Sequence, residues 1–384
     1  MDTVSHTPPV IEASGTHREV GRQIGEAARD AVARGLATYE ERFAVLAGFS
    51  FVEAVERARG YLRAAEDYVP QAVDQIRGLA EGAAVSFDGL FALNCSEEFT
   101  CKSDRVWPAP EAEPGPQPRS GPRPRAGSGP ERCTSFAVIA GGRVVAGHNE
   151  DWFPDDVANL VVRKVLLKVA GAPNASGYVS YLSVGPAYDL PITGITSAGF
   201  TSAANTVYFR DERVGVPNNC LLATALQQPD LERVRDLITR TPRARGSNHL
   251  LCDAGGRVWD IETTAQRWAF IDGAPLFTHA NHYVAPELAA GDASRSEGSR
   301  LRRTRAEELL RAGVEAGADL VELGKAVLSD HANAPFSICA HWNDDDPDED
   351  QDVTTASMVW EPAEGRAHIA CGQPCSAAYV TYEL

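Results

Sequence analysis

The sequence predicts an α+β protein in which antiparallel sheets are stacked and covered by layers of helices. The first hundred residues place apolar side chains at steps of three and four, which indicates helices. After Cys133, blocks of strand-like segments are separated by blocks of helix. This order favours stacked antiparallel sheets, because a doubly wound parallel sheet would alternate one strand with one helix.

Composition limits the class of protein. The chain has 384 residues, 43% of them hydrophobic, and a net charge of −17. The acidic excess argues against nucleic acid or an anionic membrane as the main partner. Eight cysteines without zinc-type C-x-x-C pairs are too sparse for a disulfide scaffold. The N-terminus lacks the pattern of a signal peptide, and no apolar run approaches the roughly 20 residues of a membrane span. We expect a cytoplasmic, bacterial protein.

The first predicted region, residues 1–107, is helical. The stretch "REVGRQIGEAARDAVARGLATYEERFAVL" has helical periodicity, and a second helix follows Ser50, a residue suited to N-capping. The next region, 108–132, differs, because "PAPEAEPGPQPRSGPRPRAGSGP" contains eight prolines and four glycines in 23 residues. Such a segment cannot offset its ordering entropy, so we predict a flexible linker.

The third predicted region, 133–384, is rich in strands. Helices are expected over 220–240, 297–312 and 316–329. The segments expected to form strands are "CTSFAVIA", "RVVAGHNED", "NLVVRKVLLKV", "GYVSYLSVG", "LPITGITSAGFTSAAN", "SNHLLCDAGGRVWDIETTAQRWAFID", "LFTHANHYV", "TTASMVWEP", "RAHIACGQP" and "AAYVTYEL".

Cys133 is the first candidate for chemistry, because it stands where the linker ends and a strand begins. A free thiol has a pKa of about 8.5 and needs a base to act as a nucleophile at neutral pH. An α-amino group, with a pKa of roughly 7.7–8.0, could serve if the bond before Cys133 were cut. The alternative is a buried structural cysteine.

Six motifs in order resemble the penicillin acyltransferase-like (peptidase C45) family of N-terminal-nucleophile hydrolases. They cover almost the whole chain and read "IEASGTHREVGRQIGEAA", "CTSFAV…GHNEDW", "TSAGFTSAAN", "THANHY", "DHANAPFSICAH" and "GQPCSAAYVTYEL". The resemblance implies a four-layer αββα sandwich of two antiparallel sheets flanked by helices. It also implies self-cleavage at Arg132-Cys133, where the family usually has Gly-Cys; external trimming of the linker is an alternative. The α chain (1–132) and β chain (133–384) would stay associated.

The resemblance also implies roles for individual residues. Asp151 would reach back to the new α-amino group of Cys133, and Asn281 would donate to the oxyanion. Asn205 would line the same pocket, unless it only provides a left-handed backbone at a strand end. Arg300 would lie near the aspartate and cysteine, with an exposed helical arginine as the alternative. His148, where bile-salt hydrolases carry arginine, is expected to be a structural histidine.

The implied activity is cleavage of an amide bond in a small N-acyl compound through an acyl-enzyme at Cys133. N-Acyl transfer from a coenzyme A thioester to a small amine is the alternative within the same site. An unprocessed, non-enzymatic binding protein is an alternative of a different class. The substrate and the oligomeric state are left open.

No metal or organic cofactor is expected. An H-x-x-H pair on a strand, as in His279 and His282, points to opposite faces, and no H-E-x-x-H motif is present to use His331 or His341. The acidic run "DDDPDEDQD" lacks the central glycine and the bidentate glutamate of a calcium-binding EF-hand loop, so we interpret it as a solvated loop.

Overall fold

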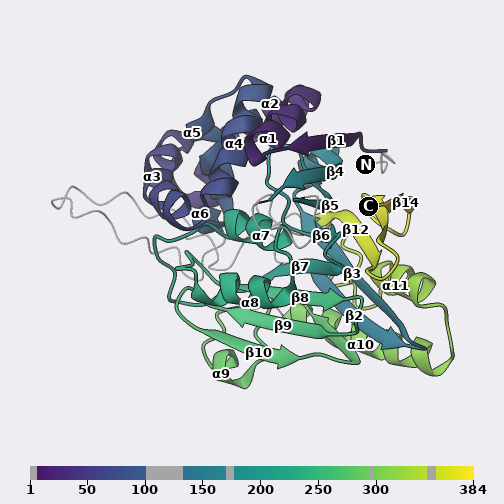
Figure 1. Cartoon of the computed structure of the whole chain (residues 1–384). Coiled ribbons are helices and arrows are strands. Elements are labelled where there is room, and N and C mark those ends of the chain that lie inside the picture. The colour runs from purple at the N-terminus through teal and green to yellow at the C-terminus, as the bar shows by residue number, and fades with distance from the viewer. Residues whose placement is uncertain (1–6, 101–132, 170–176, 295–296, 344–351) are drawn as a thin grey trace.

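The computed structural model describes residues 7–100, 133–169, 177–294, 297–343 and 352–384. Two sheets of eight and six strands form its centre (Figure 1). The predicted linker at 108–132, Arg132, and most of the acidic run at 344–352 lie outside the described residues.

The eight-stranded sheet has the order β1-β4-β5-β6-β7-β8-β9-β10. Its members are β1 (Val10–Gly15), β4 (Leu160–Lys168), β5 (Tyr178–Pro186), β6 (Gly194–Thr196), β7 (Phe200–Thr206), β8 (Ser247–Asp253), β9 (Val258–Thr263) and β10 (Trp268–Asp272). Neighbours pair antiparallel except β1 and β4, which are parallel.

The six-stranded sheet has the order β11-β2-β3-β12-β13-β14, and all of its pairs are antiparallel. Its members are β2 (Thr134–Ala140), β3 (Arg143–Trp152), β11 (Leu276–His279), β12 (Val353–Glu361), β13 (Arg366–Cys371) and β14 (Val380–Glu383).

Helices flank both sheets. They are α1 (His17–Ala27), α2 (Arg29–Ala47), α3 (Phe51–Tyr68), α4 (Pro70–Ala83), α5 (Phe87–Leu93), α6 (Ser96–Thr100), α7 (Asn218–Leu226), α8 (Leu231–Arg240), α9 (Pro286–Ala289), α10 (Glu297–Glu315) and α11 (Leu320–Leu328), with a 3₁₀ helix, η1 (Pro154–Asn159).

The buried apolar clusters follow these layers. One fills the space between the sheets and includes Val162 from the larger sheet and Met358 from the smaller. A second joins α1–α5 and α7 to the outer face of the larger sheet, and a third joins α10 and α11 to Phe136 on the smaller. The order of layers is helix, sheet, sheet, helix, which confirms the predicted fold class.

The glycine-rich N-terminal motif allows α1 and α4 to touch through their backbones. A Cβ added at Gly21 would lie 2.1 Å from the carbonyl oxygen of Gln75, and one at Gly25 would lie 2.3 Å from that of Leu79. Only glycine permits this approach. The contact stacks the first helix on the layer that covers the larger sheet.

Two local expectations were wrong. Residues Val10–Gly15 form a strand that the helical interpretation did not anticipate, and the helix expected over 220–240 is two helices. Pro229 cannot donate a backbone hydrogen bond, and the Asp230 side chain caps α8 by accepting from the Arg233 N–H. The parallel β1–β4 pair is possible because α1–α6 and the β2–β3 hairpin intervene along the chain.

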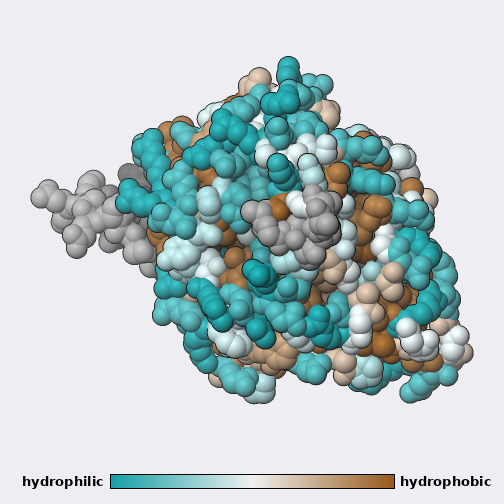
Figure 2. Space-filling model, viewed as in Figure 1, coloured by the Kyte–Doolittle hydropathy of each residue, from teal (hydrophilic) through white to brown (hydrophobic). Residues whose placement is uncertain are grey.

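The outer surface is mostly hydrophilic on the face shown in Figure 2, with smaller apolar areas between polar side chains. Among the described helices, none is both long and apolar enough to cross a lipid bilayer.

Candidate active site

A hairpin brings Cys133 beside the end of the neighbouring strand. β2 and β3 pair antiparallel, with Thr134 opposite Asn149, and Gly141-Gly142 form the turn with φ of 57° and 77°. Because glycine accepts such positive φ angles without strain, the turn can be this tight. Cys133, one residue before Thr134, therefore lies close to Asp151, two residues after Asn149.

The backbone nitrogen of Cys133 is held by Asn281. Its N–H donates to Asn281 Oδ1 at 2.9 Å, and Arg302 Nη2 donates to the same oxygen at 2.8 Å. Asn281 Nδ2 donates to the carbonyl oxygen of Thr206 at 3.0 Å. Two donors on one side and an acceptor on the other fix the orientation of the amide. One of the two amide hydrogens is used by Thr206, and the second can serve another acceptor.

Asp151 is fully buried at the end of β3. The Thr354 hydroxyl on β12 donates to Asp151 Oδ1 at 2.6 Å. The backbone N–H of Asp151 donates to the Cys133 thiol. Asp151 therefore contacts the cysteine directly through its backbone, while its carboxylate is oriented by the adjacent strand.

The Cys133 thiol lies among acidic groups. Its Sγ is 3.9 Å from Glu150 Oε1. Burial raises the pKa of the thiol well above its ordinary value, and the charges of Glu150 and Asp151 raise it further. In the intact chain the thiol is therefore protonated at neutral pH.

A buried hydrogen-bonded chain runs from Glu150 across the hairpin to the larger sheet. His148 Nε2 lies 3.1 Å from Glu150 Oε2, and His148 Nδ1 lies 2.8 Å from Ser135 Oγ. Ser135 Oγ donates to Asn205 Oδ1 at 2.8 Å. Both ring nitrogens of His148 are thus occupied.

The side-chain amide nitrogen of Asn205 lacks a hydrogen-bond acceptor in the described part of the chain. It is fully buried on β7, and its Nδ2 has no acceptor there. Leaving a buried donor unpaired costs about 1–3 kcal/mol, which a ligand oxygen could recover. Its φ is not positive, since Ala84 and Asn333 are the non-glycine residues with positive φ among those described. A left-handed backbone therefore does not explain the asparagine.

The arginine that reaches the cluster is Arg302, two residues from the predicted Arg300. Arg302 is buried and also donates to Thr134 Oγ1 at 3.3 Å. The Arg300 side chain is 59% exposed and pairs with Asp292 at 3.4 Å. Both lie on α10, and their different environments follow from the helical period of 3.6 residues.

Sequence reasoning could have found Arg302. It shares the buried face of α10 with Ala306 and Leu310, at steps of four, whereas Arg300 stands off that face. Ser135 and Thr354 were missed because no signal in the sequence distinguishes them from ordinary strand residues.

An acidic cavity of about 40 Å³ adjoins the thiol environment through Glu150. Glu97, Asp156 and Asp189 also line it. Burial raises the pKa of Asp156 to about 7, although the hydroxyls of Tyr39 and Tyr188 donate to it.

The pKa of Asp189 is also raised well above its ordinary value, by burial and by the charge of Asp156. Within the described residues Asp189 Oδ1 has no hydrogen-bond partner. Glu97 is paired with Arg245 at 2.7 Å. The remaining carboxylates suit a positively charged group.

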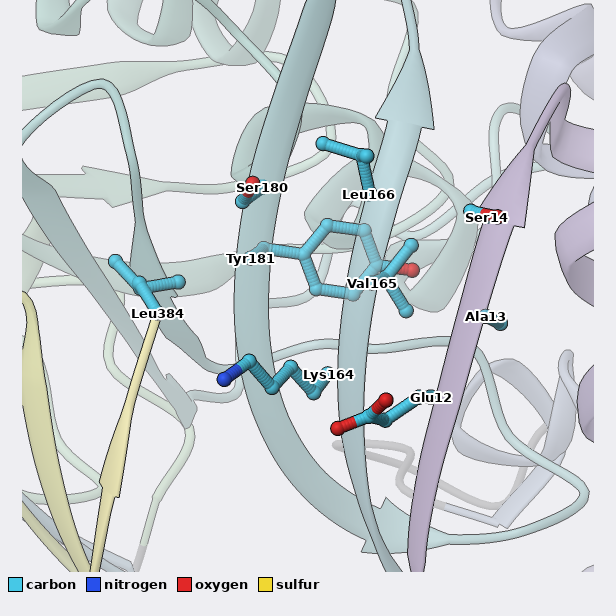
Figure 3. A pocket seen from close by; sticks show the side chains of 9 residues that line it. All are labelled: Glu12, Ala13, Ser14, Lys164, Val165, Leu166, Ser180, Tyr181 and Leu384. Carbon is cyan, nitrogen blue, oxygen red and sulfur yellow. The ribbon is translucent and has the colours of Figure 1, made fainter.

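A larger cavity, of about 600 Å³, lies elsewhere. β1, β4, β5 and the terminal Leu384 line it (Figure 3), and none of the predicted site residues takes part. It holds Glu12 and Lys164 but no cysteine or histidine. We therefore place the candidate active site at Cys133.

Comparison with known proteins agrees with the sequence motifs. Residues 139–376, more than half of the chain, match the family described as acyl-coenzyme A:6-aminopenicillanic acid acyl-transferase. The chain belongs to this family. The matched region begins after Cys133 and includes Asp151, Asn205 and Asn281.

Two solved structures are similar at low identity. Penicillin V acylase from Agrobacterium tumefaciens has 14% identity and a TM-score of 0.43, covering 62% of this chain and 83% of that one. A mutant conjugated bile acid hydrolase from Clostridium perfringens has 12% identity and a TM-score of 0.45, covering 66% of this chain and 97% of that one.

Proposed function

We propose that this member of the acyl-coenzyme A:6-aminopenicillanic acid acyl-transferase family is an N-terminal-nucleophile amidohydrolase with Cys133 as its nucleophile. The observation that carries the proposal is the hydrogen bond from the Cys133 nitrogen to Asn281 Oδ1. A buried backbone N–H needs one acceptor, and here that acceptor is itself held in place by Arg302 and by the carbonyl oxygen of Thr206. An acceptor fixed in this way suits a catalytic amine.

Maturation would release that amine. The Cys133 thiol adds to the carbonyl carbon of Arg132, and the peptide C–N bond breaks as the acyl group moves from nitrogen to sulfur. Water then hydrolyses the thioester, which leaves a carboxylate on Arg132 and a free α-amino group on Cys133. The proton lost by the thiol goes to the departing nitrogen.

The free amine would change the chemistry of the thiol. Burial and two carboxylates raise the thiol pKa in the intact chain. A neutral amine beside the thiol can accept its proton, and the resulting ammonium stabilises the thiolate. Asn281 Oδ1 is oriented to accept from that ammonium, and the Asp151 carboxylate supplies the opposite charge.

Turnover would follow the acyl-enzyme route. The thiolate attacks the carbonyl carbon of the substrate amide, and the tetrahedral oxyanion is held by N–H donors. The second hydrogen of Asn281 Nδ2 and the buried Asn205 Nδ2 are the candidates for this role. The ammonium protonates the leaving amine, and water then releases the acid from sulfur.

The acidic cavity favours a substrate with a positively charged group near the scissile amide. Asp156 and Asp189 would gain a counter-ion from such a group. Hydrolysis of a cationic N-acyl compound is therefore the leading function.

Acyl transfer is the second candidate, and the family match favours it, because that family is described by an acyl-coenzyme A-dependent transferase. Hydrolysis and acyl transfer are distinguished by two assays of the purified protein. The first uses N-acyl amides with a cationic, neutral or anionic amine portion, and the second uses an acyl-coenzyme A with a free amine. Products are followed by mass spectrometry, with Cys133→Ala as the control.

We expect free acid and free amine from the cationic amides, and no product with Cys133→Ala. Transfer of the acyl group to the amine in preference to water would establish the second candidate. If the self-cleaved protein turned over neither the N-acyl amides nor the acyl-coenzyme A with a free amine, the cationic substrate class would be removed from the proposal.

A further inference from the structure

Two histidines and two cysteines converge at the surface, in a group separate from Cys133. His331, Cys339 and His341 lie between α11 and β12, and Cys375 lies between β13 and β14. Their ligand atoms all lie within 4.8 Å of one another. Cys339 is buried, His341 is half-buried, and His331 and Cys375 are exposed, so an ion could enter from solvent.

The spacing of these atoms matches tetrahedral coordination of zinc. His331 Nε2 and His341 Nε2 are 3.0 Å apart, and His341 Nε2 lies 3.5 Å from Cys339 Sγ and 3.4 Å from Cys375 Sγ. Zinc bonds of about 2.3 Å to sulfur and about 2.0–2.1 Å to nitrogen at tetrahedral angles place two nitrogens about 3.3 Å apart and nitrogen and sulfur about 3.6 Å apart.

Hydrogen bonding alone does not account for the arrangement. His341 Nε2 has three polar neighbours within 3.5 Å. A neutral imidazole nitrogen offers either one N–H or one lone pair, so it can satisfy one of them. A cation at the centre of the four atoms satisfies all of them at once.

We propose that His331, Cys339, His341 and Cys375 form a structural Zn²⁺ site. Two thiolates and two neutral imidazoles make a closed, neutral set around the ion, and binding releases the two thiol protons to solvent. The expectation that the protein has no metal was based on separate motifs. The fold adds Cys375, which lies 34 residues after His341, to the other three.

The segment between α11 and β12 that carries His331, Cys339 and His341 is hydrogen-bonded to the candidate active site. The Ala340 N–H, between two proposed ligands, donates to Thr354 Oγ1 at 2.9 Å, and Thr354 Oγ1 donates to Asp151 Oδ1 at 2.6 Å. Asn149 Nδ2 donates to the carbonyl oxygen of Ile338 at 3.0 Å. Zinc would therefore fix the loop that orients Asp151, and its role is positioning rather than chemistry.

Other groups with ligand-type atoms in the described residues are less suited. Cys133, His148 and Glu150 form one, but both nitrogens of His148 already have partners. A third group is fully buried, and the nitrogens of its His279 are bonded to Glu262 and to the Ala280 carbonyl.

The test measures metal content and affinity on the full chain, purified under reducing conditions without chelators. Variants Cys375→Ser and His331→Ala change exposed ligands, so folding should survive. Cys133→Ala is the matched control, because it removes the thiol of the competing group. Elemental analysis gives the zinc content, and titration of the stripped protein with Zn²⁺ against a chromophoric chelator gives the affinity.

We expect close to one zinc per chain in the wild type and in Cys133→Ala. Both ligand variants should bind Zn²⁺ at least about tenfold more weakly. Co²⁺ should give a thiolate charge-transfer band that weakens in Cys375→Ser.

Three outcomes would overturn the proposal. In the first, the reduced wild-type protein binds no zinc. In the second, zinc is lost in Cys133→Ala but retained in Cys375→Ser. In the third, Cys339 and Cys375 form a disulfide, and the protein takes up no zinc after that disulfide is reduced. Circular dichroism of each variant shows whether it is folded.

Discussion

The molecule holds thiols in two contrasting settings. Cys133 is buried at a strand start, among carboxylates that raise its pKa, and its backbone nitrogen is bound by a charged cluster. Cys339 and Cys375 lie beside two imidazoles at the surface. The first setting keeps a thiol protonated until a new amine appears beside it. The second gathers imidazole nitrogens and sulfurs at the distances that ligand atoms have from one another around a metal ion.

The contrast predicts that the Cys133 setting can be disrupted without loss of zinc. The largest effect should come from Cys133→Ala, which removes the nucleophile for both steps. Self-cleavage and turnover should both be lost, and zinc content should be unchanged. Cys133→Ser should cleave more slowly, since a hydroxyl is a weaker nucleophile. Electrophoresis, product assays and elemental analysis on the same samples check this, and any cleavage by the alanine variant would contradict it.

Asn281→Ala should lower kcat by about 10²–10³-fold, because an oxyanion donor and the partner of the Cys133 amine are lost together. The measurement is steady-state kinetics on protein that is shown by circular dichroism to be folded. Near wild-type turnover would exclude Asn281 from the reaction.

Arg302→Lys and Arg300→Lys form a matched pair on one helix. The first keeps the charge but loses the two-pronged donation to Asn281 and Thr134, so turnover should fall by about tenfold or more. The second changes an exposed side chain and should have little effect. Equal kinetics in the two variants would contradict the assignment of the buried position.

The effect of Asp156→Asn on stability should be the smallest of these effects. The pKa of Asp156 is about 7 in the folded chain, against 3.8 ordinarily. Between about pH 4 and 7 the folded chain holds a proton that the unfolded chain has released, so the free energy of unfolding falls as pH rises. The variant should show a shallower decline by urea unfolding across this range. An identical slope would mean that the pKa is not raised.

The sequence was enough to predict the layered fold and the two strands that follow Cys133. Strand patterns are local properties, so they can be recognised directly in the sequence. Arg300 was predicted from its place in the motif, but the helical period of α10 turns Arg302 toward Asn281 and leaves Arg300 at the surface. Whether Cys133, Asp151, Asn205 and Asn281 act as proposed stays a prediction.

The complete group around His341 could not be predicted. Cys375 joins the other three residues only when β13 is placed beside β12, and no local pattern records that placement. Asn205 shows the same limit, because its unpaired amide nitrogen is visible only once the larger sheet has been packed against the hairpin.

The measurement that tests the central claim most directly is the intact mass of freshly purified protein under denaturing conditions, beside Cys133→Ala. The account predicts two species near 14 and 27 kDa, which are 41.2 kDa divided in proportion to residues 1–132 and 133–384, in the wild type alone. A single species of 41.2 kDa in both samples would contradict it. The chain would then be an inactive precursor or a binding protein that keeps the fold without the amine.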